Sequence, residues 1–236
     1  MKPTLSIIIP TLNEEKYLPQ LLKSIKKQDF KDYEVIVADY NSKDNTRAIA
    51  KKFGCKITKG GRPAAGRNNG AKIAGGDNLL FLDGDVILPK NFLRNMLSKF
   101  REKNLDVATC FVVPDSKNII DHFNFFFANI FIWIVQFFNP HAPGFCLLVK
   151  KKVHDRVKGF DETIFIAEDH DYVKRICKFG KFKILCCWVK FSTRRFEKEG
   201  RLKLVLKYLY FSLYRMLKGE VKKEIIKYDF GVYGKK

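Results

Sequence analysis

The sequence lacks the cysteine patterns of zinc-bound or redox-active modules. Its six cysteines form no C-x-x-C pair, and no Cys/His cluster has zinc-finger spacing. Reduced, buried thiols in an intracellular protein are the simpler interpretation. A secretory signal peptide is also missing, because the first apolar run, residues 5–9, is short and is followed by Pro10. We therefore expect the active part of the chain to stay in the cytoplasm.

Two nucleotide-binding signatures are absent as well. No G-x-G-x-x-G follows the first apolar run and there is no Walker sequence, which argues against dinucleotide oxidoreductases and P-loop NTPases. Acidic residues are scarce, with 25 against 45 basic ones, a net charge of +20. Such a field attracts polyanions: nucleic acid, anionic lipid headgroups or phosphorylated small molecules. Charge alone does not choose among them.

The first 115 residues alternate short apolar runs with amphipathic helical stretches. The pattern predicts strands at 5–9, 34–38, 56–58, 78–82 and 105–113. It predicts helices between them, the first capped by Asn13 and the others at 44–53, 66–74 and 91–101. Alternation of this kind predicts an α/β fold with a mainly parallel sheet flanked by helices. Ligands bind at the carboxyl ends of the strands in such sheets.

The second half has a different composition. Residues 122–139 contain no Asp, Glu, Lys or Arg, and a loop with two prolines and a glycine follows them. We predict a strand at 145–149, a helix at 169–179, a strand at 182–189 and a basic amphipathic helix at 201–218. The length of 236 residues suits one domain with a tail. We divide it into a domain at 1–200, with a nucleotide-binding half (1–115) and an acceptor half (116–200), and a basic amphipathic tail at 201–236.

Asp83 and Asp85, separated by one glycine, follow the predicted strand at 78–82. Two carboxylates so close together repel each other, and a divalent cation such as Mg²⁺ or Mn²⁺ would relieve that repulsion. The ion would also bind diphosphate oxygens and neutralise the charge that builds on a leaving group. A turn that merely ends the strand is the alternative, but the position at the ligand edge of the sheet favours a metal site.

Three other polar residues are candidates with open alternatives. Asp39 follows the second strand, where it is either an acceptor for a nucleobase or ribose, or a turn residue. Arg67 lies in a Gly-rich basic segment, where it either pairs with a diphosphate or is solvated. Asp169 belongs to an acidic cluster at a helix start, where it is either a general base or part of a cap.

Taken in order, these segments resemble the family 2 glycosyltransferases, which have the Rossmann-like GT-A fold of nucleotide-diphospho-sugar transferases. The resemblance spans roughly residues 4–200. The stretches that carry it are 6–15 (SIIIPTLNEE), 35–39 (VIVAD), 42–46 (SKDNT), 67–71 (RNNGA), 81–85 (FLDGD), 159–162 (GFDE) and 168–169 (ED). Tyr40 departs from the family pattern, in which many relatives have an acidic or small residue, and this leaves the identity of the donor open.

The resemblance implies an inverting, hexosyltransferase-like enzyme that moves a sugar from a UDP- or GDP-sugar to an acceptor hydroxyl. It implies that the nucleotide and its diphosphate are bound by Pro10, Thr11, Glu14, Asp39, Arg67 and Asp83. Asp83 and Asp85 would be the DXD pair that holds Mg²⁺ or Mn²⁺. Asp169 would be the catalytic base, and Gly144 would edge the acceptor pocket. The Q-x-x-R-W sequence of processive synthases is absent, which favours transfer of single sugars.

Two segments indicate contact with an anionic membrane surface. The helix at 201–218 has only basic charges, and its apolar face is formed by Leu202, Val205, Leu206, Leu209, Leu213, Met216 and Leu217. The uncharged segment 122–139 is near the lower limit for crossing a bilayer, but three amide side chains interrupt it. We expect a re-entrant or interfacial helix pair there; a helix packed on the domain is the alternative. The enzyme would be peripheral on the cytoplasmic face of the cell membrane, with a lipid-linked or membrane-proximal acceptor.

Two other functions fit part of the pattern. A sugar-phosphate nucleotidyltransferase would need a Gly-rich, Arg-containing loop straight after the first strand, and residues 10–15 do not provide one. A non-enzymatic nucleic-acid-binding module would explain the charge but leave Asp83 and Asp85 without a purpose. We therefore expect no nucleic-acid partner. Arg194 and Arg195 either bind a phosphate of donor or acceptor, or are solvated.

Overall fold

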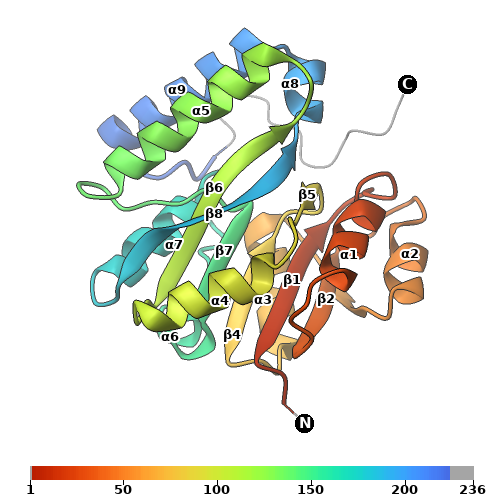
Figure 1. Cartoon of the computed structure of the whole chain (residues 1–236). Helices are drawn as coiled ribbons and strands as arrows, with labels where there is room; N and C mark the ends of the chain where they lie inside the picture. Colours follow the sequence, from red (N-terminus) through yellow and green to blue (C-terminus); the bar gives the residue numbers. More distant parts are fainter. Residues whose placement is uncertain (1, 224–236) are drawn as a thin grey trace.

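The computed structural model describes residues 2–223 (Figure 1). The strands are β1 (Leu5–Thr11), β2 (Tyr33–Asp39), β3 (Lys56–Lys59), β4 (Asn78–Leu82), β5 (Val86–Ile87), β6 (Val107–Asp115), β7 (Cys146–Lys150) and β8 (Phe182–Ser192). The helices are α1 (Leu18–Lys26), α2 (Thr46–Lys52), α3 (Pro63–Ile73), α4 (Phe92–Glu102), α5 (Ile119–Val135), α6 (Lys151–Arg156), α7 (Glu168–Cys177), α8 (Arg194–Glu199) and α9 (Arg201–Lys218). Part of the predicted tail, residues 224–236, and the side chain of Met216 lie outside what the structure describes.

The described strands form one sheet in the order β3-β2-β1-β4-β7-β6-β8-β5. Neighbours run parallel except at β4–β7, β6–β7 and β5–β8. Helices α1, α2 and α4 cover one face, and α3, α6 and α7 cover the other (Figure 1). The predicted α/β class, with a mainly parallel sheet flanked by helices, is confirmed.

Strand β1 lies in the middle of the sheet and is buried on both faces. Leu5, Ile7 and Ile9 belong to the core under α1 and α4, whereas Ile8 belongs to the core under α3. This alternation follows from the two-residue period of a strand, and it explains why β1 reads as a continuous apolar run. Its carboxyl end, at Thr11, pairs with Asp39 of β2, whereas its pairing with β4 ends at Ile8.

The prediction that Asn13 caps the first helix is wrong. Asn13 has a φ of 55°, in the left-handed region, and its side-chain oxygen accepts from the backbone N–H of Lys43 at 2.9 Å. Helix α1 begins only at Leu18, with a proline in its first turn. The segment between β1 and α1 is therefore a loop tied to the loop after β2, and both lie at the ligand edge of the sheet.

The boundaries of the other helices and strands differ less from the predicted ones. Strand β4 and helix α9 begin and end at the predicted residues, whereas α3 begins at Pro63, before the predicted start at Gly66. The expected helix pair within 122–139 is instead one helix, α5, whose first turn is capped by the side chain of Asn118. Among residues 2–223, no helix has both the length and the apolar character needed to span a bilayer. The short elements β5, α6 and α8 were not predicted, because they are too brief to show periodicity.

Candidate functional site

Polar side chains from β1 and β2 meet where these two strands end. Thr11 donates from its hydroxyl to Asp39 at 3.2 Å, and Ser42 donates to the same carboxylate from its backbone N–H at 3.1 Å and its hydroxyl at 2.5 Å. Asp39 is only 4% exposed. Its carboxylate is thus fixed in place, whereas the next residue along the chain, Tyr40, is exposed. A fixed, buried acceptor of this kind suits the recognition of a nucleobase or ribose donor group.

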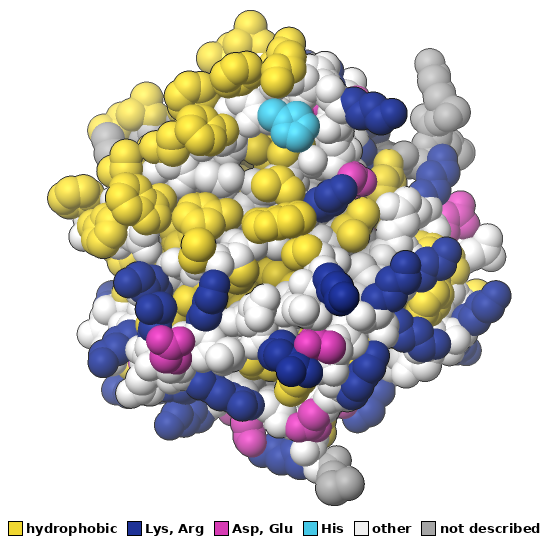
Figure 2. Space-filling model, in the orientation of Figure 1, with side chains coloured by type: hydrophobic (Ala, Val, Ile, Leu, Met, Phe, Trp, Pro, Cys, Tyr) yellow, Lys and Arg dark blue, Asp and Glu magenta, His cyan; other side chains and the backbone are white. Residues whose placement is uncertain are grey.

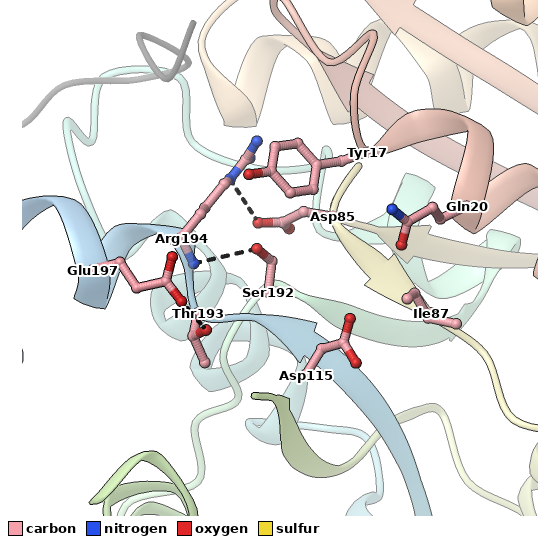
Figure 3. A pocket seen from close by; sticks show the side chains of 9 residues that line it. All are labelled: Tyr17, Gln20, Asp85, Ile87, Asp115, Ser192, Thr193, Arg194 and Glu197. Carbon is pink, nitrogen blue, oxygen red and sulfur yellow. Dashed lines mark hydrogen bonds and ion pairs between the residues drawn. The ribbon is translucent and has the colours of Figure 1, made fainter. Parts of the chain in front are cut away.

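Arg194 contacts two of the predicted site carboxylates, and Figure 3 shows its contact with one of them, Asp85. Its guanidinium forms two hydrogen bonds of 2.7 Å to Glu14 and a contact of 3.0 Å from Nε to Asp85, and it stacks 4.3 Å from the Tyr17 ring centre. Arg194 begins α8, directly after β8. The chain after β8 therefore places the guanidinium of Arg194 against the acidic side of the site. Arg194 and Glu14 are 180 positions apart in the sequence.

Burial governs the charge state of these carboxyls. It raises the pKa of Asp85 to about 7; Arg194 opposes the rise, whereas the neighbouring Asp83 and Glu14 add to it. Burial also raises the pKa of Glu14, again against the effect of Arg194. One arginine is thus not enough to offset the desolvation and mutual repulsion of the acidic groups around it.

Arg67 lies inside the molecule, at the centre of a second network. Its guanidinium donates to Glu168, to Asp83 at 3.0 Å and to the carbonyl of Gly144 at 3.3 Å. It is 3% exposed, and its buried Nε has no hydrogen-bond partner among the described residues. Arg67 therefore joins Asp83 to the start of α7. Its contact with a diphosphate stays a prediction.

Asp169 is a further carboxyl at this edge, with its side chain 14% exposed. It accepts from the backbone N–H of His170 at 2.8 Å and from that of Gly144. Burial raises its pKa to about 7, with Glu168 adding to the rise and Arg67 opposing it. A β-carbon at Gly144 would lie 2.5 Å from Arg67 Nη2 and 2.9 Å from Asp169 Oδ2, so only glycine leaves room for both side chains.

His170 has a role that the sequence did not reveal. Its ring stacks on His141 with centroids 4.5 Å apart, and Arg215 of α9 donates to its Nδ1 at 2.8 Å. Burial holds the pKa of His170 well below its usual value, so the ring is neutral. Because Nδ1 accepts, the proton lies on Nε2, which is 3.9 Å from Asp169. His170 therefore lies beside the candidate base as a neutral ring.

The residues that could hold a divalent ion are Asp83 and Asp85. Their oxygens are the donors that Mg²⁺ and Mn²⁺ prefer, and the Asp83 side chain is 34% exposed. Among residues 2–223, no cluster of three or more His, Cys, Asp or Glu side chains is arranged around a common point. The pair fits an ion that takes its remaining ligands from water and substrate phosphate, as Mg²⁺ usually does. For Asp85 to bind the ion, the guanidinium of Arg194 would have to move away from the Asp85 carboxylate.

A polar cavity of about 180 Å³ adjoins this site (Figure 3). Asp85, Arg194 and Tyr17 line it together with Asp115 and Ser192, the last residues of β6 and β8. Thr11, Asp39, Arg67 and Asp169 do not line it. The cavity thus adjoins the predicted nucleotide site through Asp85 and Arg194 and does not contain it.

Helices α5 and α9 expose a broad apolar surface, where hydrophobic atoms gather in Figure 2. The exposed side chains are Ile119, Ile120, Phe123, Phe126, Phe127, Ile130, Phe131, Trp133, Ile134, Leu202, Leu206, Leu209, Leu213 and Leu217. Most basic residues of α9 are engaged in ion pairs with carboxylates: Arg201 with Asp121, Lys207 with Glu199, and Arg215 with Glu220. The expected basic face of α9 is therefore partly neutralised, and the apolar area dominates this surface.

Comparison with known proteins identifies the fold and the family. A β-1,3-glucosyltransferase of Campylobacter jejuni that acts on GalNAc(5)-diNAcBac-PP-undecaprenol is 34% identical over 132 residues, 52% of this chain and 42% of that protein. The structure of Staphylococcus aureus TarS (residues 1–349) with UDP-GlcNAc matches with a TM-score of 0.65 and 22% identity, over 80% of this chain and 58% of that one. The structure of a mannosyltransferase of Pyrobaculum calidifontis, in complex with GDP-Man and Mn²⁺, matches with a TM-score of 0.65 and 18% identity. The match covers 89% of this chain and 65% of that one.

These structural likenesses establish the GT-A fold. The chain spans less than half the length of the C. jejuni relative, so that protein's substrates do not transfer to it directly. The model of the family described as "Glycosyl transferase family 2" matches residues 6–156, which is more than half of the chain and includes the ends of β1, β2 and β4. The chain therefore belongs to glycosyltransferase family 2.

Proposed function

We propose that the protein transfers a single sugar from a UDP- or GDP-sugar to an acceptor hydroxyl, with inversion at the anomeric carbon. One observation carries the proposal: the buried guanidinium of Arg67 contacts both Asp83 and the start of α7, where Asp169 lies. This network brings the predicted diphosphate side and the predicted base to one edge of the sheet, as a transfer reaction requires.

In this proposal the residues have the following roles. Thr11, Asp39, Glu14 and the neighbouring Pro10 bind the nucleotide. Asp83 and Asp85 hold Mg²⁺ or Mn²⁺, which when bound neutralises charge on the diphosphate. Asp169 takes the proton of the acceptor hydroxyl, whose oxygen forms the new bond to the anomeric carbon as the bond to the diphosphate breaks. The UDP-GlcNAc, and the GDP-Man with Mn²⁺, in the two solved structures support this donor class and metal.

Donor hydrolysis tests the proposal without a known acceptor, because water can take the acceptor's place slowly. We expect a screen of nucleotide sugars with Mn²⁺ to find at least one that is hydrolysed. Asp169 must be ionised to accept a proton, so the rate should rise with pH up to about 7 and then level. A rate that is flat between pH 5 and 8 would exclude Asp169 as the base.

The raised pKa values of Asp85 and Asp169 also make the stability of the fold depend on pH. Stability is expected to change with pH in the opposite direction to activity. The folded-state pKa values of Asp85 and Asp169 lie above the ordinary value of 3.8. Their contribution to stability is therefore fully present below that value and is lost as the pH rises through about 7. Between these limits activity should increase while the free energy of unfolding decreases.

We also propose that the protein is peripheral on the cytoplasmic face of a membrane and that its acceptor is lipid-linked. The apolar surface of α5 and α9 supports this, because monomeric soluble proteins rarely expose such contiguous area. The undecaprenol-linked substrate named for the C. jejuni relative supports the acceptor class. In this proposal residues 1–200 are the catalytic domain and 201–236 a tail that contacts the bilayer.

Vesicle flotation tests the membrane proposal. We expect the protein to float with vesicles containing phosphatidylglycerol and to dissociate only partly at high salt, because apolar contact dominates. The double variant Leu209→Glu/Leu213→Glu should lose flotation, since both side chains are more than half exposed. Ile73→Glu, an exposed apolar position on α3, is the matched control and should float normally. Protein that never floats would refute the proposal.

A further inference from the structure

An apolar groove runs between the end of β6 and the start of α5. It has a volume of about 460 Å³, and its walls include Val113 and Pro114 of β6 and Phe123 and Phe126 of α5. The side-chain amide of Asn129 bonds both the N–H and the carbonyl of Val112, at 3.0 and 2.7 Å. The helix is thus fastened to the strand, and the polar groups of Val112 and the Asn129 amide at this wall are hydrogen-bonded to each other.

Two consecutive residues of β6 line the groove and the polar cavity of the candidate site. Pro114 lines the groove, and the following residue, Asp115, lines the cavity together with Asp85 and Arg194. In the β6–β8 register Pro114 pairs with Phe191 and Asp115 with Ser192, another cavity residue. A molecule that is apolar at one end and polar at the other could therefore occupy both spaces at once.

A cation lies close to Asp115, which lines the polar cavity. Lys190 pairs with Val113 in the β6–β8 register, and its ammonium group lies 3.7 Å from Asp115. Its side chain is 48% exposed, so the charge is available to a ligand. A positive charge near a polar cavity and one strand residue away from an apolar groove complements a phosphate attached to a hydrocarbon chain.

We propose that the groove binds the hydrocarbon chain of the acceptor, a lipid whose phosphate or diphosphate links that chain to the accepting head group. The chain lies against Phe123 and Phe126, the phosphate lies near Lys190, and the head group reaches the cavity beside Asp85. The inference rests on the proposed transferase function, because it assigns a place to that reaction's acceptor. It differs from general membrane contact, because it requires one saturable site.

Calorimetric titration with alkyl phosphates, kept below their micelle-forming concentrations, tests the inference. We expect one site per chain for dodecyl phosphate. Affinity should increase about two- to fourfold for each methylene added from decyl to tetradecyl phosphate. Inorganic phosphate alone should bind far more weakly. Affinity that is independent of chain length would overturn the inference.

Two adjacent phenylalanines give a matched pair of variants. Phe126 lines the groove and Phe127 does not, and their side chains are similarly exposed, at 58% and 62%. We expect Phe126→Glu to weaken dodecyl phosphate binding at least tenfold and Phe127→Glu to leave it within about twofold. Val113→Trp, which fills the groove, should reproduce the loss. Equal weakening by the two glutamate variants would mean that the chain binds the surface generally, which contradicts the inference.

Nucleotide binding in the presence of Mn²⁺ separates this inference from the proposed function. It should be unchanged in Phe126→Glu and Phe127→Glu. Wild-type protein that binds no nucleotide would defeat the proposed function, whereas intact nucleotide binding without chain-dependent phosphate binding would defeat only the groove.

Discussion

Replacing Asp169 by asparagine should lower the rate of sugar transfer by about 10²- to 10⁴-fold, the usual contribution of a positioned general base. Asparagine keeps the size of the side chain and cannot take a proton from the acceptor. The affinity for the nucleotide should change little, because the nucleotide-binding residues proposed on β1 and β2 do not contact Asp169. Single-turnover kinetics and nucleotide titration measure the two effects separately.

Asp171→Asn is the matched control for this variant. Asp171 lies on the same helix and pairs with Arg175 at 2.7 Å, within that helix. A pair of this kind contributes a few tenths of a kcal/mol, so the variant should remain folded and active. Thermal unfolding of both variants would show whether a loss of rate comes from the chemistry or from the fold. A transfer rate in Asp169→Asn equal to that of the control would remove Asp169 from the mechanism.

Replacing Arg194 by alanine should lower the free energy of unfolding by about 3–5 kcal/mol, the cost of leaving buried partner charges uncompensated. Glu14 and Asp85, 8% exposed at their side chains, would lose their shared cation. Mn²⁺ should then restore part of the stability, and more than it adds to the wild type, because the ion no longer competes with the guanidinium. Denaturant unfolding with and without Mn²⁺ measures both effects.

Two further variants serve as comparisons for Arg194→Ala. Arg94→Ala removes an arginine from an exposed pair with Asp29, so it should cost less than about 1 kcal/mol. Arg194→Lys keeps a charge but loses the bidentate geometry, and its stability should lie between wild type and Arg194→Ala. If the alanine variant is as stable as the Arg94 control, the ion pair does not matter for the fold.

The sequence alone predicted the elements with strong periodicity. Strand β4 is a continuous apolar run that ends at an Asp-Gly-Asp turn, so both its type and the position of Asp83 could be predicted. The convergence of Thr11, Asp39 and Asp83 on one edge followed from the parallel order of β1, β2 and β4. The family resemblance then supplied the roles of these residues, which periodicity could not.

The contacts that organise the site could not be predicted in this way. Arg67 meets Glu168 across 101 positions and Arg194 meets Glu14 across 180, and no local pattern encodes such pairings. Asn13 was predicted as a helix cap because asparagine favours both caps and left-handed turns. Here the hydrogen bond that its side chain accepts from Lys43 stabilises the left-handed turn. The long-range pairings are set by how the chain after β7 packs against the first half.

The central claim is that Asp83 and Asp85 hold a divalent ion that binds the donor's diphosphate. Titration of UDP and GDP against the folded protein, with and without Mn²⁺, tests it most directly through thermal stability. We predict that one nucleotide stabilises the wild type only with Mn²⁺, by about 2.7 kcal/mol at a hundredfold excess over Kd, and that Asp85→Ala loses this gain while Asp171→Asn keeps it. Stabilisation that is the same with and without the ion, or no stabilisation by either nucleotide, would contradict the claim.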